Sequence, residues 1–521
     1  MNRVSFNNSI INFFYNHKII QKILFLTIII ICIFIFYNTL LTVLYPLNLG
    51  YGEGIILYQV EDLIVGKFDL NTIYPDFKIL PYNVNPYTPI YILLVGFINH
   101  IFNLSAVLVG RLLSFVSFLL TGLVIFKISS LFFGNKNKFL SLSISFIFLS
   151  SFLIFFKFSI VHVDMLGFLF YLSGIFFFFK YFFKQKDIFL YLSAILLVIA
   201  FYTKQTYLIF PISVILYLFF SRNKDFFKFF LLFSGLSALL FFWINLITHG
   251  NFFLHVVFQN TLHQISLYKI FRNWTVFFVE QRGLIFIFFI IILNCSFYYF
   301  FMKDFYSRFS KITKKFVSFM LIYVPSGCIF TLLATSKVGA SINHFFEVMF
   351  INILLLIISF TLVLEHKKVK SKLLFVFKIQ KIIIENSLLL ICLFVFLENF
   401  YYMRDLNFYL YNNLPSELVL INEINRGDYY YSDVPVFLTH TKSLPTTIDP
   451  FIFTQLYRNN WLGFSDIEKL VKNGKLKKII LSESLDNNFK KSFYNGEMKY
   501  LFDQYYIFKR NIAGKFIYEL K

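Results

Sequence analysis

Apolar segments of close to twenty residues recur along the first four hundred residues, separated by shorter polar stretches. A helix of that length can cross the ~30 Å hydrocarbon core of a bilayer. The first segment is too long for a signal peptide and no small-residue cleavage site follows it, so we expect it to be retained as a membrane helix. Eleven spans are predicted, at residues 22–45, 104–126, 139–158, 164–183, 188–203, 206–220, 226–249, 283–302, 316–336, 345–364 and 383–401.

The apolar run at residues 88–101 is shorter than the others and begins within a segment that contains Pro86 and Pro89. A run of this length is typical of an interfacial or re-entrant helix. We therefore predict a helix that does not cross the membrane. The range of predicted spans is 11–13, with eleven as the preferred number.

The pattern changes at about residue 402, where the charge density rises and turn residues become frequent. The segment SDIEKLVKNG, from residue 465, has the periodicity of a short amphipathic helix, and KLKKIILSE, which follows it directly, reads as a strand. The predicted fold is therefore an all-α polytopic membrane bundle with juxtamembrane helices in the first outer loop. Residues 1–401 form the membrane domain, and residues 402–521 form a small α/β domain outside the membrane.

Composition agrees with a membrane protein and excludes an ordinary soluble one. The chain of 521 residues is 58% hydrophobic, 22% aromatic and only 14% charged, with a mean hydropathy of +0.71. All four cysteines lie in apolar runs and none has the spacing of metal ligands. The sequence therefore predicts neither a disulfide framework nor a zinc site.

The net charge of +21 is distributed as a topology signal. With the N-terminus in the cytoplasm, the inside segments carry 23 Lys and Arg, and the outside segments of the membrane part carry 8. This is the positive-inside bias, so the basic residues indicate lipid head groups and orientation, and no nucleic-acid partner is predicted. Composition and motifs indicate a bacterial plasma-membrane protein of the cell envelope, with its C-terminal domain outside.

Two acids are the first candidates for chemistry on the outer side. Glu53 lies between Gly52 and Gly54, directly after the first span, and Asp164 begins a later span. Paired glycines suggest close approach of another group. These carboxylates could deprotonate a hydroxyl or hold a divalent cation, although the metal requirement stays open. Glu61 or Asp62 could be the catalytic acid in place of Glu53.

Outward cations provide the matching positive charge. Lys204, Arg282 and Lys337 could hold a phosphate or pyrophosphate. Ionisable residues at outward span ends are functional candidates because burying them in lipid is costly. The other predicted substrate-binding residues are aromatic or polar and lie on the same side: Tyr58, Tyr87, Gln205, Asn343, His344 and Glu347.

Each candidate has a structural alternative. Lys204 could extend to the lipid head groups, and Asp164 could cap its helix. His162 and His344 fit structural polar roles, and Glu347 lies one helical turn from Asn343 and could pair with it. Arg111, inside a span, is expected to pair within the bundle.

The order of these motifs resembles the C-type glycosyltransferase superfamily, in particular family-39-like members such as bacterial aminoarabinose transferases and protein O-mannosyltransferases. The resemblance covers essentially the whole chain. Its features are an acid early in the first outer loop (Glu53), a Pro-containing approach to the next apolar run (NPYTPIY), a second outward acid (Asp164), the turn AFYTKQT and the segment GASINHFFE. Many relatives carry Asp, often in an Asp-Glu pair, where this chain has a lone Glu53.

The resemblance implies a transferase that uses a polyprenyl-phosphate-linked sugar and works among membrane lipids. Lys204 and Arg282 would hold the phosphate, Glu53 would act as general base or bind a metal, and Asp164 would orient Lys204 or the acceptor. Attack at the anomeric carbon would invert its configuration. The sugar, the acceptor and the oligomeric state stay open.

Three other functions are compatible with a polytopic membrane protein. A transporter or lipid flippase would favour mid-span acids, broken helices and repeated halves, which are not evident here. A surface-polysaccharide polymerase or ligase tends to have Arg-rich outer loops, and these loops contain few arginines. A structural subunit would have no chemistry at all. Release of polyprenyl phosphate from a labelled donor discriminates among them.

Overall fold

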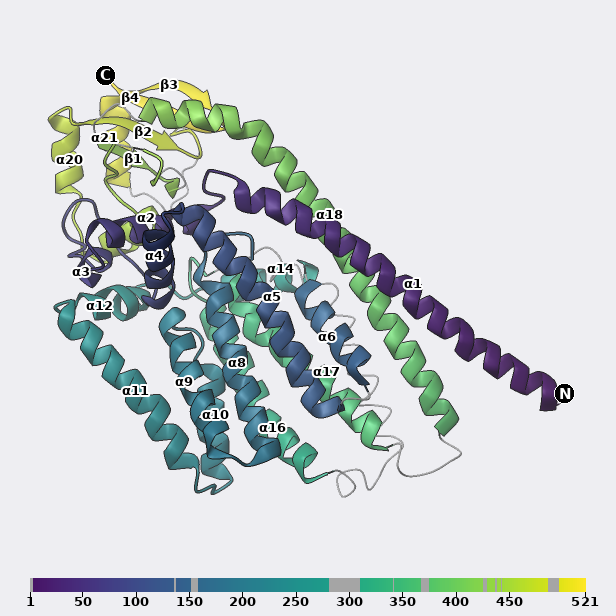
Figure 1. Cartoon of the computed structure of the whole chain (residues 1–521). Helices are drawn as coiled ribbons and strands as arrows, with labels where there is room; N and C mark the ends of the chain where they lie inside the picture. Colours follow the sequence, from purple (N-terminus) through teal and green to yellow (C-terminus); the bar gives the residue numbers. More distant parts are fainter. Residues whose placement is uncertain are drawn as a thin grey trace.

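The computed structural model describes residues 3–134, 137–150, 158–280, 310–340, 342–366, 374–424, 429–435, 438–441, 443–485 and 496–521. A bundle of helices forms the main body, two long helices lean along one side of it, and a small mixed sheet covers one end (Figure 1). This arrangement confirms the predicted fold class.

The described helices of the bundle form two groups by burial. The apolar windows of α8 and α17 are 61% and 83% buried, whereas that of α11 is 11% buried. α8 packs against α5 and α9, which places it at the centre, and α11 lies at the edge (Figure 1). The helices are α5 (Ala106–Phe133), α6 (Lys138–Ser150), α8 (Val163–Lys184), α9 (Asp187–Thr203), α10 (Ile209–Phe220), α11 (Phe226–Ile247), α16 (Lys311–Thr335) and α17 (Phe346–His366).

Two long helices run side by side along the bundle, α1 (Arg3–Leu44) and α18 (Leu374–Ile424) (Figure 1). Buried hydrogen bonds join them, since Thr42 donates to the Asn407 side chain at 2.8 Å and Asn407 donates to the backbone carbonyl of Asn38 at 2.8 Å. α18 is continuous through residues 401 and 402, where the sequence predicts a domain boundary. One unbroken helix therefore joins the membrane part to the C-terminal domain.

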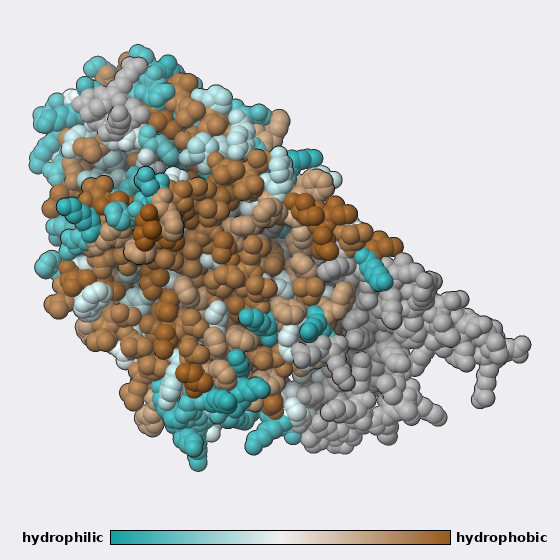
Figure 2. Space-filling view, viewed as in Figure 1, coloured by the Kyte–Doolittle hydropathy of each residue, from teal (hydrophilic) through white to brown (hydrophobic). Residues whose placement is uncertain are grey.

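Six of the described helices are long and apolar enough to cross a membrane, so the chain is a multi-pass membrane protein. Apolar residues form a broad band on the visible face, with hydrophilic residues gathered at its two ends (Figure 2). Ten of the eleven predicted spans coincide with helices, and the span at 283–302 lies outside the described residues. Residues 88–101 correspond to α4 (Ile90–Phe102), whose length of roughly 20 Å is less than the bilayer core.

Short helices connect the bundle to the C-terminal domain. The first outer loop contains α2 (Tyr51–Val65), α3 (Leu70–Ile73) and α4, which lie beneath that domain (Figure 1). A second connecting region contains α12 (Asn251–Phe253), the π-helix η2 (Leu254–Phe258), α13 (Gln259–Thr261) and the amphipathic α14 (Leu267–Glu280). Phe277 of α14 stacks on Phe345 of the 3₁₀ helix η4 (Ile342–Phe345) with a 4.3 Å centroid distance.

The C-terminal domain contains a four-stranded sheet in the order β1-β2-β4-β3. β1 and β2 are parallel, and the other two pairs are antiparallel. The helix predicted from SDIEKLVKNG is α20, and the strand predicted from KLKKIILSE is β2. The elements are β1 (Tyr429–Ser432), α19 (Pro450–Arg458), α20 (Ser465–Lys472), β2 (Leu476–Leu481), α21 (Gly496–Tyr505), β3 (Tyr506–Ile512) and β4 (Lys515–Leu520).

The first outer loop and the C-terminal domain share one hydrophobic core. Phe77, Tyr82 and Val84 of the loop are buried with Phe453 and other apolar residues of the domain. Tyr82 also exchanges backbone hydrogen bonds with the domain, donating to Thr446 at 3.0 Å and accepting from Ile448 at 3.1 Å. The domain is thereby held over the end of the bundle where α2 and α4 lie.

Candidate active site

A buried polar cluster surrounds Asp164, in the first turn of α8. Lys204, which caps the end of α9, forms an ion pair with Oδ1 of Asp164. His162 Nδ1 lies 2.7 Å from Oδ2, and Asn343 Nδ2 lies 3.4 and 3.3 Å from the two oxygens. The structure therefore brings together three predicted site residues, Asp164, Lys204 and Asn343, from distant parts of the chain.

Burial explains why these charges are paired. Asp164 is fully buried and Lys204 is 5% exposed, so each would be strongly destabilised without its partner. The alternative in which Lys204 extends to the lipid head groups is wrong for this conformation, because its ammonium group contacts a buried carboxylate. Glu53 and Arg111 form a second buried ion pair.

His162 extends the cluster toward the first outer loop. Its Nε2 lies 3.4 Å from the hydroxyl oxygen of Tyr87, a predicted substrate-binding residue. A Cβ atom on Gly52 would lie 3.4 Å from the His162 ring, which is ordinary van der Waals contact, so the ring packs directly against the start of α2. An imidazole with one nitrogen on a carboxylate has the arrangement that supports proton transfer at its other nitrogen. The sequence had favoured a structural role for His162.

Glu53 occupies a different kind of site. Its carboxylate is 1% exposed and forms a bidentate ion pair with Arg111 of α5, at 2.9 Å from Nε and 3.0 Å from Nη2. The backbone N–H groups of Leu49 and Val161 also donate to it, the latter at 2.7 Å. Arg111 was expected to pair within the bundle, and Glu53 is that partner.

In this conformation the Glu53 carboxylate is not free, because both oxygens accept hydrogen bonds from Arg111 and from backbone N–H groups. Its predicted role as general base stays a prediction. Arg111 also donates to the backbone carbonyls of Thr42, Tyr45 and Leu47, at 3.1, 2.5 and 2.7 Å. The pair therefore ties the end of α1 to α2, α5 and the residue before His162.

An apolar cavity of about 590 Å³ opens beside the cluster, between α9 and the turn that follows it, α11, α16 and the short helices α12, η2 and α13. Aromatic and aliphatic side chains form most of its wall, including Phe241, Phe252 and Phe330. Three predicted site residues contribute its polar part, together with a histidine from the second connecting region: Gln205, Lys337, His344 and His263. We call this space the basic cavity, because none of the described residues that line it is acidic.

Lys337 is the principal cation of the basic cavity. Its ammonium group donates to the backbone carbonyl of Asn260 at 3.1 Å. Burial lowers the pKa of Lys337, and burial also lowers the pKa of His263. An anion bound here would reverse that loss by stabilising the charged forms.

The remaining predicted residues lie apart from the cluster. Glu347 is buried in α17 and accepts hydrogen bonds from Tyr171 and Tyr323, so the alternative in which it pairs with Asn343 is wrong. Tyr58 packs against a small apolar cluster between α2 and the C-terminal domain. Arg282 lies outside the described residues, and its predicted phosphate contact stays a prediction.

Glu61 and Asp62 lie on the second half of α2, away from His162. Asp62 accepts a hydrogen bond from Asn83 at 3.3 Å, whereas Glu61 makes no hydrogen bond or ion pair within the described part of the chain. Partial removal from water raises the pKa of each to about 7, and the charge of Asp62 adds to the effect on Glu61. Among the described residues, no group of three or more His, Cys, Asp or Glu is arranged to hold a metal ion.

The C-terminal domain supplies a residue that sequence reasoning missed. Asp449 caps α19 and accepts a hydrogen bond from the hydroxyl of Tyr51 at 2.7 Å. Tyr51 is the residue directly before Gly52. Burial raises the pKa of Asp449. The Asp-Pro pair at residues 449 and 450 is a recognisable helix start, but nothing local indicates its partner 398 residues away.

Comparison with known proteins agrees with this architecture. Residues 86–247 match the family described as dolichyl-phosphate-mannose-protein mannosyltransferase. ArnT from Cupriavidus metallidurans bound to undecaprenyl phosphate is similar, with a TM-score of 0.57, 9% identity, and 95% of this chain and 97% of that chain covered. The apo structure of the same protein has a TM-score of 0.54 and 10% identity, with the same coverage of both chains.

No curated protein sequence matches the chain. The matched segment nevertheless includes Asp164, AFYTKQT and all but the first residue of NPYTPIY, three of the features on which the resemblance was based. The predicted resemblance is therefore confirmed: the chain has the fold of ArnT, and residues 86–247 match the mannosyltransferase family of the C-type membrane glycosyltransferases.

Proposed function

We propose that the protein is a membrane glycosyltransferase that moves a sugar from a polyprenyl-phosphate donor to an acceptor. The observation that carries this proposal is the basic cavity, an apolar space with Lys337 in its wall, beside the buried Asp164–Lys204 pair. A polyprenyl-phosphate sugar has an apolar tail, an anionic phosphate and a polar sugar, which correspond to these parts. The similarity to ArnT, which binds undecaprenyl phosphate, supports the choice of donor.

In this proposal the polyprenyl tail enters the basic cavity from the bilayer. Phe241 and Phe330, from α11 and α16, offer apolar contact to it. Lys337 attracts the phosphate, and Arg282 is its predicted second cation. Lys204, held by Asp164, offers a positive charge on the other side of Gln205. The sugar then lies toward His162 and Tyr87.

The proposed reaction is a single displacement with inversion at the anomeric carbon. The acceptor oxygen forms a bond to that carbon while the bond from the carbon to the phosphate oxygen breaks, releasing polyprenyl phosphate. The acceptor's proton passes to a base. His162 has the geometry for this role, because Asp164 orients it through Nδ1 and its Nε2 is directed at Tyr87. Glu53 is assigned as a positioning residue that holds the segment before His162.

We place the reaction at the outer face of the plasma membrane. The distribution of Lys and Arg supports this orientation, since the α8–α9 and α10–α11 turns carry Lys184, Lys186, Arg222 and Lys224. Those turns lie at the end of the bundle opposite the C-terminal domain (Figure 1). Single cysteines introduced at Lys186 and Lys475 should be labelled by an impermeant maleimide from the inside and the outside, respectively.

The decisive test uses purified protein in nanodiscs with labelled polyprenyl-phosphate sugars, in the presence of total membrane lipid as acceptor source. We expect release of polyprenyl phosphate by the wild-type protein and loss of release in Asp164→Asn. Asp503→Asn, an exposed acid of the C-terminal domain, is the control and should retain activity. Absence of release from every donor tested would overturn the proposed function.

A further inference from the structure

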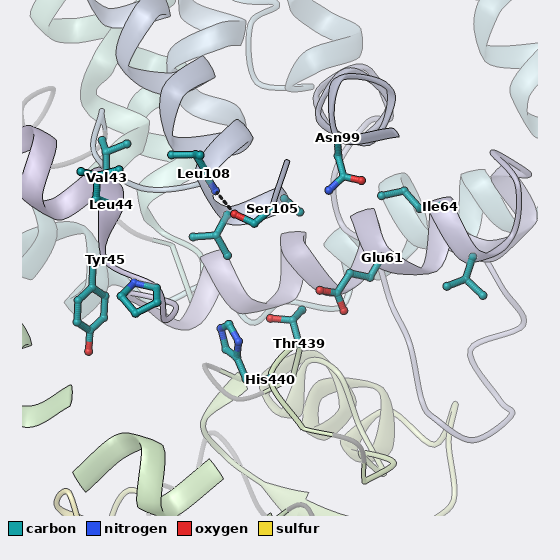
Figure 3. Close-up of a pocket in the computed structure, with 14 residues that line it drawn as sticks. Val43, Leu44, Tyr45, Glu61, Ile64, Asn99, Ser105, Leu108, Thr439 and His440 are labelled. Atoms are coloured by element: carbon teal, nitrogen blue, oxygen red, sulfur yellow. Dashed lines mark hydrogen bonds between the residues drawn. The ribbon is translucent and has the colours of Figure 1, made fainter. Parts of the chain in front are cut away.

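A second cavity, of about 710 Å³, lies where the end of α1 meets α2 and the start of α5. Its wall comes from four places: the end of α1, the outer half of α2, the corner between α4 and α5, and a loop of the C-terminal domain (Figure 3). Among its lining residues, Glu61 and His440 carry the titratable groups that approach it from opposite sides. We call this space the acidic cavity.

One part of the acidic cavity is apolar and faces the bilayer. Val43, Leu44, Ile64, Val65, Val107 and Leu108 line it. Leu44 is 55% exposed and Val65 is 83% exposed, and Phe102, at the neighbouring end of α4, is 66% exposed. Such exposed apolar side chains at the end of membrane helices are stable in contact with lipid. An acyl chain can therefore reach this part of the cavity from the membrane.

The other part is polar and is formed by side chains from four elements. The side chains of Glu61, Asn99, Ser105, Thr439 and His440 converge on this part (Figure 3). Thr439 and His440 are both held by Asn48, at 3.3 and 3.2 Å, so the loop of the C-terminal domain is fixed over the space. Glu61 has no such partner in the described part of the chain, and its carboxylate is open to a ligand.

This cavity differs from the basic cavity in the charge of the residues that line it. The residues that line it include neither Lys nor Arg, and the nearest guanidinium, that of Arg111, is fully bonded to Glu53 and to backbone carbonyls. A phosphate head group would meet the Glu61 carboxylate and no free cation, which is unfavourable. A carboxylate, an amide and hydroxyls instead suit the hydroxyl groups of a sugar.

The protonation of Glu61 fits this use. With a pKa of about 7, its carboxyl is divided between the two forms at neutral pH and can both donate to and accept from sugar hydroxyls. Tyr45, in the same wall, accepts a hydrogen bond from Arg111 through its backbone carbonyl at 2.5 Å, so the cavity lies next to the Glu53–Arg111 pair.

We propose that the acidic cavity is the loading site of the acceptor, and that this acceptor is a lipid with an uncharged sugar head group. This inference rests on the proposed transferase function and names its acceptor class. The alkyl part lies between the ends of α1 and α5, and the sugar lies between Glu61 and His440.

Photo-cross-linking in nanodiscs tests the site directly. The probe is an alkyl maltoside with a diazirine in its chain, and the comparison probe is a phosphatidic acid with the same diazirine. We expect the maltoside to label residues 43–46 and 105–108, and we expect Val107→Trp, which fills the cavity, to reduce that labelling at least tenfold. Val116 lies on the exposed face of the same helix, outside the cavity, so the probe should label the Val116→Trp variant as strongly as it labels the wild type.

Glu61→Gln provides a second variant that leaves the cavity open. It should weaken competition by unlabelled maltoside about three- to tenfold, whereas Asp503→Asn should not. Equal labelling of wild type and Val107→Trp would overturn the proposal, as would stronger labelling of these residues by phosphatidic acid. Thermal stability of each variant must match the wild type, so that lost labelling reports the site and not unfolding.

The cross-linking result is independent of turnover. If wild-type protein releases no polyprenyl phosphate but the maltoside labels the cavity, the proposed function fails and the cavity still binds glycolipid. If release occurs and the cavity does not label, the acceptor site lies elsewhere and this inference fails alone.

Discussion

The basic and acidic cavities have similar sizes, about 590 and 710 Å³, and both present apolar walls to the bilayer, yet their charged groups are opposite. The first contains Lys337 and two histidines and no described acid. The second contains Glu61 and no Lys or Arg. If lipid tails enter both spaces, as proposed, the charged groups are what would discriminate between the lipids. An anionic phosphate favours the basic cavity, and an uncharged polar head favours the acidic one.

The Glu53–Arg111 pair lies next to the acidic cavity, since Arg111 donates to the backbone carbonyl of Tyr45 in its wall. Five predictions test this comparison, beginning with that pair.

Arg111→Ala should have the largest effect, because it leaves the Glu53 carboxylate buried without its partner. We expect a loss of about 3–5 kcal/mol in the free energy of unfolding, sufficient to abolish recovery of folded protein. Thermal unfolding after purification, and the amount recovered from membranes, measure it. The double variant Glu53→Gln/Arg111→Met should recover part of the loss. If Arg111→Ala were as stable as the wild type, the Glu53–Arg111 pair would not have the structural role assigned to it.

Glu53→Gln separates the two interpretations of this residue. If Glu53 is a positioning residue, removing its charge should lower both the thermal stability and the activity of the protein. A variant with unchanged thermal stability and abolished release of polyprenyl phosphate would instead support the general-base interpretation.

Asp164→Asn should reduce release of polyprenyl phosphate by a factor on the order of 10² or more, because it removes the carboxylate that orients His162 and Lys204. His162→Gln should show a comparable loss and should remove the acidic limb of the pH–rate profile. Membrane abundance and thermal stability are the controls. Near-normal turnover in both variants would place the proton transfer at another residue.

Lys337→Gln should raise the KM for the donor about tenfold with a smaller change in kcat, as expected when one contact of a charged group with phosphate is lost. Lys475→Gln, an exposed lysine of the C-terminal domain, is the matched control. Labelling of the acidic cavity by the maltoside probe should not change. An increase in KM for both variants would indicate a general charge effect and no phosphate contact in the basic cavity.

Glu61→Gln should have the smallest effect, on the pH dependence of stability. The pKa of Glu61 rises from 4.5 to about 7 on folding, so its contribution is present below about pH 4.5 and is lost as the pH rises through about 7. The melting temperature of the variant should therefore equal that of the wild type at pH 4 and be slightly higher than that of the wild type at pH 8. A difference of the same size at both values would show that the effect is not due to titration of this group.

The fold was largely predictable, because hydropathy acts locally. Segments such as 164–183 and 226–249 coincide with α8 and α11 to within a few residues. The strand order of the C-terminal sheet was not predicted, since pairing between β2 and β4 depends on contacts across some forty residues. The helix α4 was predicted from its short length and from the prolines at its start.

The sequence predicted which residues lie at the same side of the membrane. It did not predict which of them contact one another, and those contacts determine the chemistry. Asp164 and Lys204 were both found because charged residues are rare at span ends. Glu53 and Arg111 were both noticed, but 58 residues separate them and no local pattern joins them. His162 was assigned a structural role because its carboxylate contact is visible only once α8 is folded against the loop before it.

The common core of Phe77, Tyr82 and Val84 with the C-terminal domain bears on the engineering of chimeras between proteins of this fold. A graft that replaced residues 429–521 alone would leave these three side chains against a foreign surface, and Tyr82 without its backbone partners. The exchangeable module therefore comprises two separate pieces of the chain, about 350 residues apart in sequence. Swapping acceptor loops between relatives requires both pieces to be transferred together.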